Sequence, residues 1–367
     1  MGVEIILMRK RIEWIDICKG ILIITIVLMH IDADFWVNNK FGIYINNLSS
    51  LYKVAIFFCV SGLTIKDEEI SNTKKFIIKK IKTLWSKIIV FGSIAVVCHN
   101  ALIKIGFYDI NTNYAGKRMF FYDTNHIIKE LIFTVVMANR EIIIGPLWYA
   151  NVLFMALMIL AIVDKFAHVI TKNNNDSRYV RFIITLILML SSSFLTNILD
   201  FTIPRFNNSL SAVFLIDLCQ LIYHKYHIQF NNWRVFTIFL IVLLNLPFYG
   251  KLSLNNNYYL NPTYLIAVSI TSMYILFFIS KRVRGGLAKM LSFFGRQSFY
   301  IMALHFFAFK IGTKFLLMFE IKGNVATITP YASNLPMMVF YLLIGLFIPS
   351  FIGVFIYRIG RFLNEKA

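Results

Sequence analysis

The stretch KGILIITIVLMH, from Lys19 to His30, is almost wholly apolar but carries a cation at one end and an imidazole at the other. In an α-helix, a spacing of 11 residues corresponds to about 16 Å along the axis and returns to within about 20° of the same face. Ionisable residues inside a membrane span indicate a functional site. The simpler alternative is that Lys19 extends to the lipid headgroups and His30 lies in the opposite interface. We favour a functional pair, because other segments point the same way.

The composition is that of a membrane protein. The chain has 367 residues, 58% of them hydrophobic, and a mean hydropathy of +0.69, which is too apolar for a soluble domain. The net charge of +19 falls in short clusters between apolar runs, as in cytoplasmic loops, so we expect no nucleic-acid partner. Four single cysteines have neither CxxC spacing nor a paired histidine, so we expect no metal site: Cys18, Cys59, Cys98 and Cys219.

Ten apolar segments are long enough, or nearly long enough, to span a bilayer. They are 14–31, 48–65, 84–105, 142–163, 179–197, 208–223, 235–249, 262–280, 298–319 and 336–357. We therefore expect an all-α, polytopic bundle of about ten transmembrane helices that forms a single domain over residues 1–367. The shorter apolar segment 127–138 is expected to form an interfacial or re-entrant helix.

The distribution of basic residues predicts the orientation of these spans. With the N-terminus inside, the inner segments contain 23 Lys and Arg residues and the outer loops contain 8. Such a bias is typical of cytoplasmic loops, so both termini are expected in the cytoplasm.

This orientation places Lys19 near the inner surface and His30 in the outer third of the membrane. A ligand held at Lys19 would need an arm of about 16 Å to reach His30. The pantetheine arm of coenzyme A has about this length, and its phosphates favour cations. The basic entry to the third span supplies further candidates for phosphate binding, or alternatively a patch for lipid headgroups: Lys74, Lys75, Lys79, Lys80 and Lys82.

Further candidates flank His30 and occupy a late span. Asp32 and Asp34 follow His30 and are expected to orient its imidazole. In SFYIMALH, residues 298–305, Tyr300 and His305 lie on an otherwise apolar helix. His305 is expected about 10 Å into the membrane from the inner side, either in the site or as a buried, hydrogen-bonded core histidine.

Two more motifs have structural alternatives. FFCVSGL contains Ser61 and Gly62, small residues for which we favour close helix packing. GPLWY, residues 145–149, contains Trp148 and Tyr149, which also fit an aromatic belt at the membrane interface.

Taken in order, these segments resemble the acyltransferase 3 family of integral membrane acyltransferases, especially its fucose 4-O-acetylase-like and capsule O-acetyltransferase branch. The family's first helix has a basic residue, ten intervening residues and a histidine, as in Lys19–His30. FFCVSGL, FIIKKIKTLW, GPLWY and SFYIMALH are similar to its later motifs. The family usually has arginine at the position of Lys19, so this chain keeps the charge but loses bidentate phosphate binding.

The resemblance implies transfer of an acetyl or other acyl group from acetyl-CoA, a cosubstrate rather than a permanent cofactor, to a hydroxyl of a cell-surface or lipid-linked carbohydrate. Under this hypothesis, Lys19 and the lysines between 74 and 82 bind the CoA phosphates. His30 acts as general base or covalent relay, and Tyr300 and His305 line the channel. The expected location is the bacterial cytoplasmic membrane. A flippase, transporter or polymerase for lipid-linked oligosaccharide is the alternative, since such proteins also line passages with buried charges.

Overall fold

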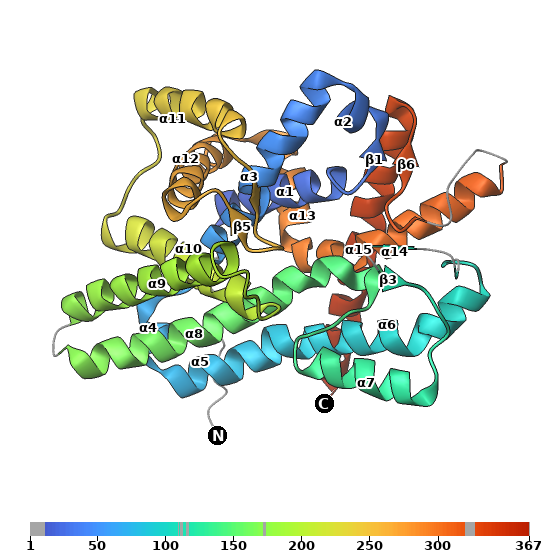
Figure 1. The fold of residues 1–367 in the computed structure, drawn as a ribbon, viewed down its shortest axis with the longest axis horizontal. Coiled ribbons are helices and arrows are strands. Elements are labelled where there is room, and N and C mark those ends of the chain that lie inside the picture. The colour runs from blue at the N-terminus through green and yellow to red at the C-terminus, as the bar shows by residue number, and fades with distance from the viewer. Residues whose placement is uncertain are drawn as a thin grey trace.

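The chain folds almost entirely into helices, as the computed structural model in Figure 1 shows. The structure describes residues 12–108, 110, 113–114, 117–171, 174–319 and 327–366. The basic N-terminal residues 9–11, which contribute to the charge count, lie outside these residues. The predicted all-α membrane bundle is confirmed.

Where the structure describes it, the first half of the chain contains seven α-helices, three very short strands and two irregular helical turns. Its elements are α1 (Glu13–Leu28), β1 (Asp32–Ala33), α2 (Asp34–Asn38), α3 (Lys40–Leu63), α4 (Asp67–Ser71), α5 (Thr73–Lys80), η1 (Ile81–Trp85), α6 (Ser86–Lys104), β2 (Asn113–Tyr114), β3 (Lys117–Arg118), α7 (Thr124–Val135) and η2 (Ile142–Leu147).

The second half is equally helical. Its elements are α8 (Trp148–Ile170), α9 (Asn174–Asn197), α10 (Phe206–Gln220), η3 (Leu221–Lys225), α11 (Trp233–Asn245), η4 (Leu246–Phe248), β4 (Leu252–Ser253), β5 (Tyr258–Tyr259), α12 (Pro262–Ser280), α13 (Gly285–Arg296), α14 (Ser298–Leu317), β6 (Tyr331–Ala332) and α15 (Leu335–Lys366).

Seven helices within the described residues are long and apolar enough to cross a membrane. One of them runs without interruption from Thr73 to Lys104, because η1 is a π-helical turn that joins α5 to α6. The basic run and the third predicted span are therefore one helix. Three predicted spans correspond to shorter helices, α1, α10 and α11, so the total of ten spans stays a prediction.

The helix α1 is buried among other helices and packs on α3, α12, α13, α14 and α15. Its close approach to α13 depends on two glycines. A Cβ atom on Gly20 would overlap the backbone of Leu291, and one on Gly295 would overlap the backbone of Asp16. Gly62 of α3 likewise packs against the backbone of Ile216 in α10, which agrees with the close packing expected for FFCVSGL.

Two distant parts of the chain meet beside the end of α1. Strand β1 pairs in parallel with β6, so that Asp32 lies opposite Tyr331 and Ala33 lies opposite Ala332. The segment after α1 is thereby fixed to the segment before α15. Helices α8 and α9 lie side by side elsewhere in the bundle, with α5 packed on α8 (Figure 1).

Candidate active site

Two histidines that are far apart in the sequence meet inside the bundle. The helix α1 ends at Leu28, and His30 lies in the turn that follows, where its backbone N–H donates to the carbonyl of Val27 at 3.1 Å. His305 lies on α14 and is fully buried. The centroids of the two imidazole rings are 5.3 Å apart. Phe306 contacts the His30 ring edge-on, with a centroid distance of 5.1 Å, and so limits its rotation.

The hydrogen bonding of His305 defines its tautomer. Its Nδ1 lies 2.8 Å from the carbonyl oxygen of Ile301, and a carbonyl can only accept, so Nδ1 carries the proton. In the neutral ring, Nε2 then carries the free lone pair. This nitrogen is buried and has no hydrogen-bond partner among the described residues. An unsatisfied buried polar atom costs about 1–3 kcal/mol, so the His305 Nε2 atom is a candidate for a chemical role.

His30 lines a cavity of about 240 Å³. The end of α1, the middle of α3, the start of α8, the β4 loop and α14 all contribute to its wall. Trp148 and Tyr149 form an aromatic side, while Ser253 and Asn255 add polar groups. The cavity thus combines an imidazole, hydroxyl and amide groups, and flat aromatic surface, which suits a small polyhydroxylated molecule.

Lys53 also lines this cavity, and the sequence reasoning did not single it out. It lies in the middle of α3, one of the helices long enough to span the membrane. Its ammonium has neither an ion pair nor a hydrogen bond within the described part of the chain. The available signal was a lysine inside the predicted span 48–65, because such residues are expensive in a membrane and mark functional sites.

Tyr149 belongs to the core rather than to the membrane interface. The side chain is buried, its ring is 4.5 Å from that of Phe58, and its hydroxyl is 3.5 Å from Ser61 Oγ. The interpretation of GPLWY as an interfacial belt is therefore wrong for Tyr149. FFCVSGL therefore packs behind Tyr149 of GPLWY, and Tyr149 in turn lines the cavity that contains His30.

A buried polar cluster fixes the segment that leads into this wall. Both oxygens of the Glu141 carboxylate lie within 3.2 Å of His99 Nδ1, and the hydroxyls of Tyr108 and Tyr122 donate to the same carboxylate. The Tyr122 ring stacks on His99 with centroids 3.6 Å apart. Burial, together with Glu141, raises the pKa of Tyr122. Because η2 begins directly after Glu141, this cluster holds η2 and the start of α8 in place.

Asp32 and Asp34 have partners other than His30. Thr329 Oγ1 donates to Asp32 Oδ2, and the Tyr331 hydroxyl donates to Asp34 Oδ1 at 2.8 Å. The Asp34 carboxylate thereby raises the pKa of Tyr331. Among the described residues, neither carboxylate bonds to His30. The geometry instead assigns them to the connection between the segments at β1 and β6.

Tyr300 faces another helix. Its ring lies 6.0 Å from that of Phe91 on α6, and the ammonium of Lys87 is 5.6 Å from its centroid. It lies five positions before His305, so the two side chains leave α14 about 140° apart. The structure therefore brings His305, but not Tyr300, to His30.

The predicted phosphate-binding lysines lie on two different helices. Lys19 is half-buried in the second turn of α1. Lys79 pairs with Glu69 at 3.1 Å, and Lys80 lies 5.1 Å above the Phe76 ring. The remaining members of the run are exposed: Lys74, Lys75 and Lys82. These positions are compatible with a cationic surface on α5, and the binding role stays a prediction.

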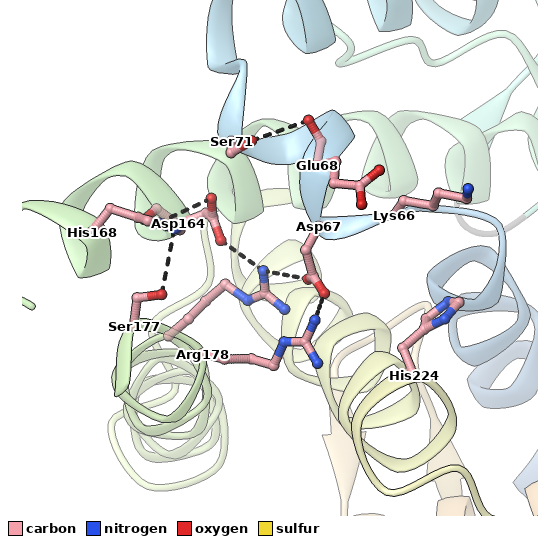
Figure 2. Close-up of a pocket in the computed structure, with 10 residues that line it drawn as sticks. Lys66, Asp67, Glu68, Ser71, Asp164, His168, Ser177, Arg178 and His224 are labelled. Atoms are coloured by element: carbon pink, nitrogen blue, oxygen red, sulfur yellow. Dashed lines mark hydrogen bonds and ion pairs between the residues drawn. The ribbon is translucent and has the colours of Figure 1, made fainter. Parts of the chain in front are cut away.

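A second, larger cavity of about 700 Å³ lies between α4, α8, α9 and the turn after α10. Figure 2 shows that charged side chains from these elements point into it. Its lining includes Lys66, Asp67, Glu68, Ser71, Asp164, His168, Ser177, Arg178, Arg181 and His224. The sequence reasoning named none of these residues as a site.

Arg181 is the centre of this charged cluster. Its buried guanidinium contacts three carboxylates: Asp164 at 2.6 Å, Asp217 at 2.9 Å and Asp67 at 3.1 Å. Arg178 pairs with the other side of Asp67. The arginines therefore already have anionic partners, and the cluster joins four helices rather than offering free cations to a ligand.

Comparison with known proteins gives one match. The family profile described as an acyltransferase domain (Acyl_transf_3) matches residues 12–357, nearly the whole chain. No curated protein and no solved structure matches the chain at a significant level.

Proposed function

Because the chain belongs to the acyltransferase family whose profile spans residues 12–357, we propose that it transfers an acetyl group from acetyl-CoA to a hydroxyl of a cell-surface or lipid-linked carbohydrate. The observation that supports this proposal most directly is the contact of His305 with His30, which itself lines a small polar and aromatic cavity. We also propose the bacterial cytoplasmic membrane as its location and the capsule O-acetyltransferase branch as its closest relationship.

In the proposed reaction, His30 takes the proton from the acceptor hydroxyl as that oxygen attacks the thioester carbonyl. The new C–O ester bond forms, the C–S bond breaks, and the proton is returned to the leaving CoA thiolate. In the alternative sequence, His30 first receives the acyl group and then passes it to the hydroxyl. In either sequence, the His305 ring packs against His30, with ring centroids 5.3 Å apart, and is proposed to orient the His30 imidazole.

The donor and the acceptor are proposed to approach from opposite ends of α1. Lys19 lies near the start of this helix and His30 follows its end, so a phosphate-bearing head and a reactive thioester fit the two positions. Lys74, Lys75, Lys79, Lys80 and Lys82 are proposed as additional cations for the phosphates. The elements around His30 include the β4 loop and the start of α8, which belong to predicted outer segments.

The proposal is tested by supplying purified full-length protein with acetyl-labelled CoA and an extract of lipid-linked and surface glycans. We expect labelled ester in the glycan fraction with wild-type protein and none with His30→Ala. His126→Ala is the matched control, because His126 lies on α7, is partly exposed and does not belong to the lining of the His30 cavity. If glycan export or chain length changes in His30→Ala cells while O-acetyl content per glycan is constant, a flippase or polymerase replaces the acyltransferase.

General base and covalent relay are separated by trapping. Wild-type protein incubated with acetyl-labelled CoA and no acceptor retains label on the chain only if His30 carries the acyl group. Absence of trapped label, with transfer intact once the acceptor is added, assigns the general-base role.

A further inference from the structure

The described lining of the His30 cavity contains no acidic residue that could pair with the Lys53 ammonium. The lining contains His30 and Lys53 but, among the described residues, no aspartate or glutamate. The carboxylates described above bond to other groups: Asp34 accepts from Tyr331, and Glu141 accepts from two tyrosine hydroxyls. A lysine in the middle of a membrane helix is stable only if it reaches water, a protein partner or a bound anion.

A second cation without a carboxylate partner among the described residues, Arg205, lies next to residues that line the cavity. Arg205, which precedes α10, donates from Nη1 to Asn255 Oδ1 at 3.3 Å, and its guanidinium lies 5.8 Å from the Trp148 ring centroid. Asn255 and Trp148 both line the cavity. Arg205 has no carboxylate partner in the part of the chain that the structure describes. Lys53 and Arg205 together therefore place positive charge in and beside the cavity that contains His30.

We infer that this cavity binds an acceptor whose sugar carries an anionic group, a carboxylate or a phosphate, and that Lys53 pairs with that group. The inference rests on the proposed function and narrows its substrate class from carbohydrates in general to acidic ones. A desolvated ammonium forms a strong, charge-assisted hydrogen bond with either kind of oxygen. Because Lys53 and His30 line one cavity, the anionic group and the reacting hydroxyl belong to the same or an adjacent sugar.

The size and lining of the cavity agree with this assignment. At about 240 Å³ it is smaller than the roughly 300 Å³ at which typical ligand pockets begin, so it accommodates about one sugar ring. Trp148 and Tyr149 offer aromatic surface, and Ser50, Ser253 and Asn255 offer partners for ring hydroxyls. Lys53 then distinguishes an acidic ring from a neutral ring of the same shape.

The competing role for Lys53 is catalytic. An ammonium beside the reacting atoms also stabilises the oxyanion that forms when the thioester is attacked. That role affects every acceptor equally, whereas recognition of an anionic acceptor affects only charged ones. The two roles therefore differ in how a Lys53 variant treats a charged acceptor and a neutral isostere.

The test compares matched probes on the purified full-length protein. Methyl glucuronide and methyl glucuronamide differ only in charge, and methyl glucoside 6-phosphate and methyl glucoside supply the phosphate comparison. We expect wild-type protein to bind one charged probe about tenfold more tightly than its neutral counterpart. Lys53→Met removes this preference without changing affinity for the neutral probe, and Lys53→Arg retains it. The preferred pair identifies the anion as carboxylate or phosphate.

Other outcomes overturn the inference. Equal affinity of the wild-type protein for the charged and neutral members of both pairs excludes an anionic acceptor. A Lys53→Met variant that still binds the charged probe more tightly than the neutral one excludes the role of Lys53 in recognition. A variant in which kcat falls by the same factor for charged and neutral acceptors, with KM unchanged, assigns Lys53 to catalysis instead. Because binding is measured without acetyl-CoA, a preference that depends on Lys53 stands even if wild-type protein transfers no acetyl group, in which case the proposed function alone fails.

Discussion

The imidazole rings of His30 and His305 lie with their centroids 5.3 Å apart, although 275 positions separate them in the sequence. The carbonyl of Ile301 holds the proton on His305 Nδ1 and leaves Nε2 free. The Phe306 ring contacts both imidazoles edge-on. We propose that the two imidazoles act together in the reaction.

If the imidazoles act as a unit, their substitutions are not additive. We expect His305→Ala to reduce acetyl transfer by about 10²-fold or more, because the general base loses the ring that packs against it and orients it. The variant His30→Ala/His305→Ala should be no slower than His30→Ala alone. Single-turnover rates on the purified variants check this expectation. Independent, multiplying losses would show that His305 is merely a packed core residue.

The connection between Asp34 and Tyr331 leads to a contrasting expectation. Asp34→Asn and Tyr331→Phe each remove one exposed hydrogen bond at 2.8 Å, and both should keep most of the activity. If Asp34 instead orients His30, Asp34→Asn lowers kcat while Tyr331→Phe does not. Measuring kcat for both variants under saturating donor therefore decides between the sequence prediction and the geometry.

The long apolar segments of the chain were sufficient to predict the helical bundle, because an α-helix satisfies the hydrogen-bonding groups of its own backbone inside lipid. Ionisable residues inside these spans also identified His30 and His305 as candidates, and the structure brings the two rings into contact. Element ends were less predictable. Strand β1 begins at Asp32, so His30 lies in a turn rather than in the helix, since pairing with β6 ends the helical path.

Hydrogen-bond and ion-pair partners on different helices could not be predicted from the sequence, because no spacing rule links residues on separate helices. Asp32 and Asp34 were assigned to His30 by proximity along the chain, whereas a segment about 300 positions away supplies their hydrogen bonds. The ion pairs of Arg181 with Asp67, Asp164 and Asp217 were missed for the same reason. Lys53 could be recognised in the sequence as a charge within a predicted span. That it lines the same cavity as His30 is visible only in the structure.

The donor side is tested at Lys19. We expect Lys19→Leu to raise the KM for acetyl-CoA by about tenfold, as loss of a charge-assisted hydrogen bond to phosphate would. Lys19→Arg should retain or improve the KM, because a guanidinium binds phosphate through two parallel hydrogen bonds. Initial rates at limiting donor, compared with those for Lys289→Leu on the exposed face of α13, provide the measurement. Full activity of Lys19→Leu at limiting donor excludes the phosphate role.

A functional charge at Lys53 should reduce stability. We expect Lys53→Met to raise the apparent Tm in detergent by about 2–4 °C, since it replaces an ammonium that lacks a counter-ion among the described residues with an apolar chain of similar length. The gain should disappear when wild-type protein is saturated with its preferred charged probe, because the bound anion supplies the missing partner. A Tm below that of the wild type, without ligand, would indicate a protein partner for Lys53.

Replacing Arg181 should lower stability, in contrast to replacing Lys53, because the charge of Arg181 is already paired with carboxylates. Replacing it with methionine leaves the carboxylates of Asp67, Asp164 and Asp217 without their common cation, and breaking such a buried pair costs about 3–5 kcal/mol. We therefore expect Arg181→Met to lower Tm and membrane abundance strongly. Arg178→Met is the matched control, because Arg178 is more exposed and, among the described residues, pairs with one carboxylate, Asp67. Thermal unfolding of both variants in the same detergent measures the difference. Equal melting temperatures for the two variants would mean that the cluster does not hold the helices together, and the cavity of Figure 2 would then need a role in binding.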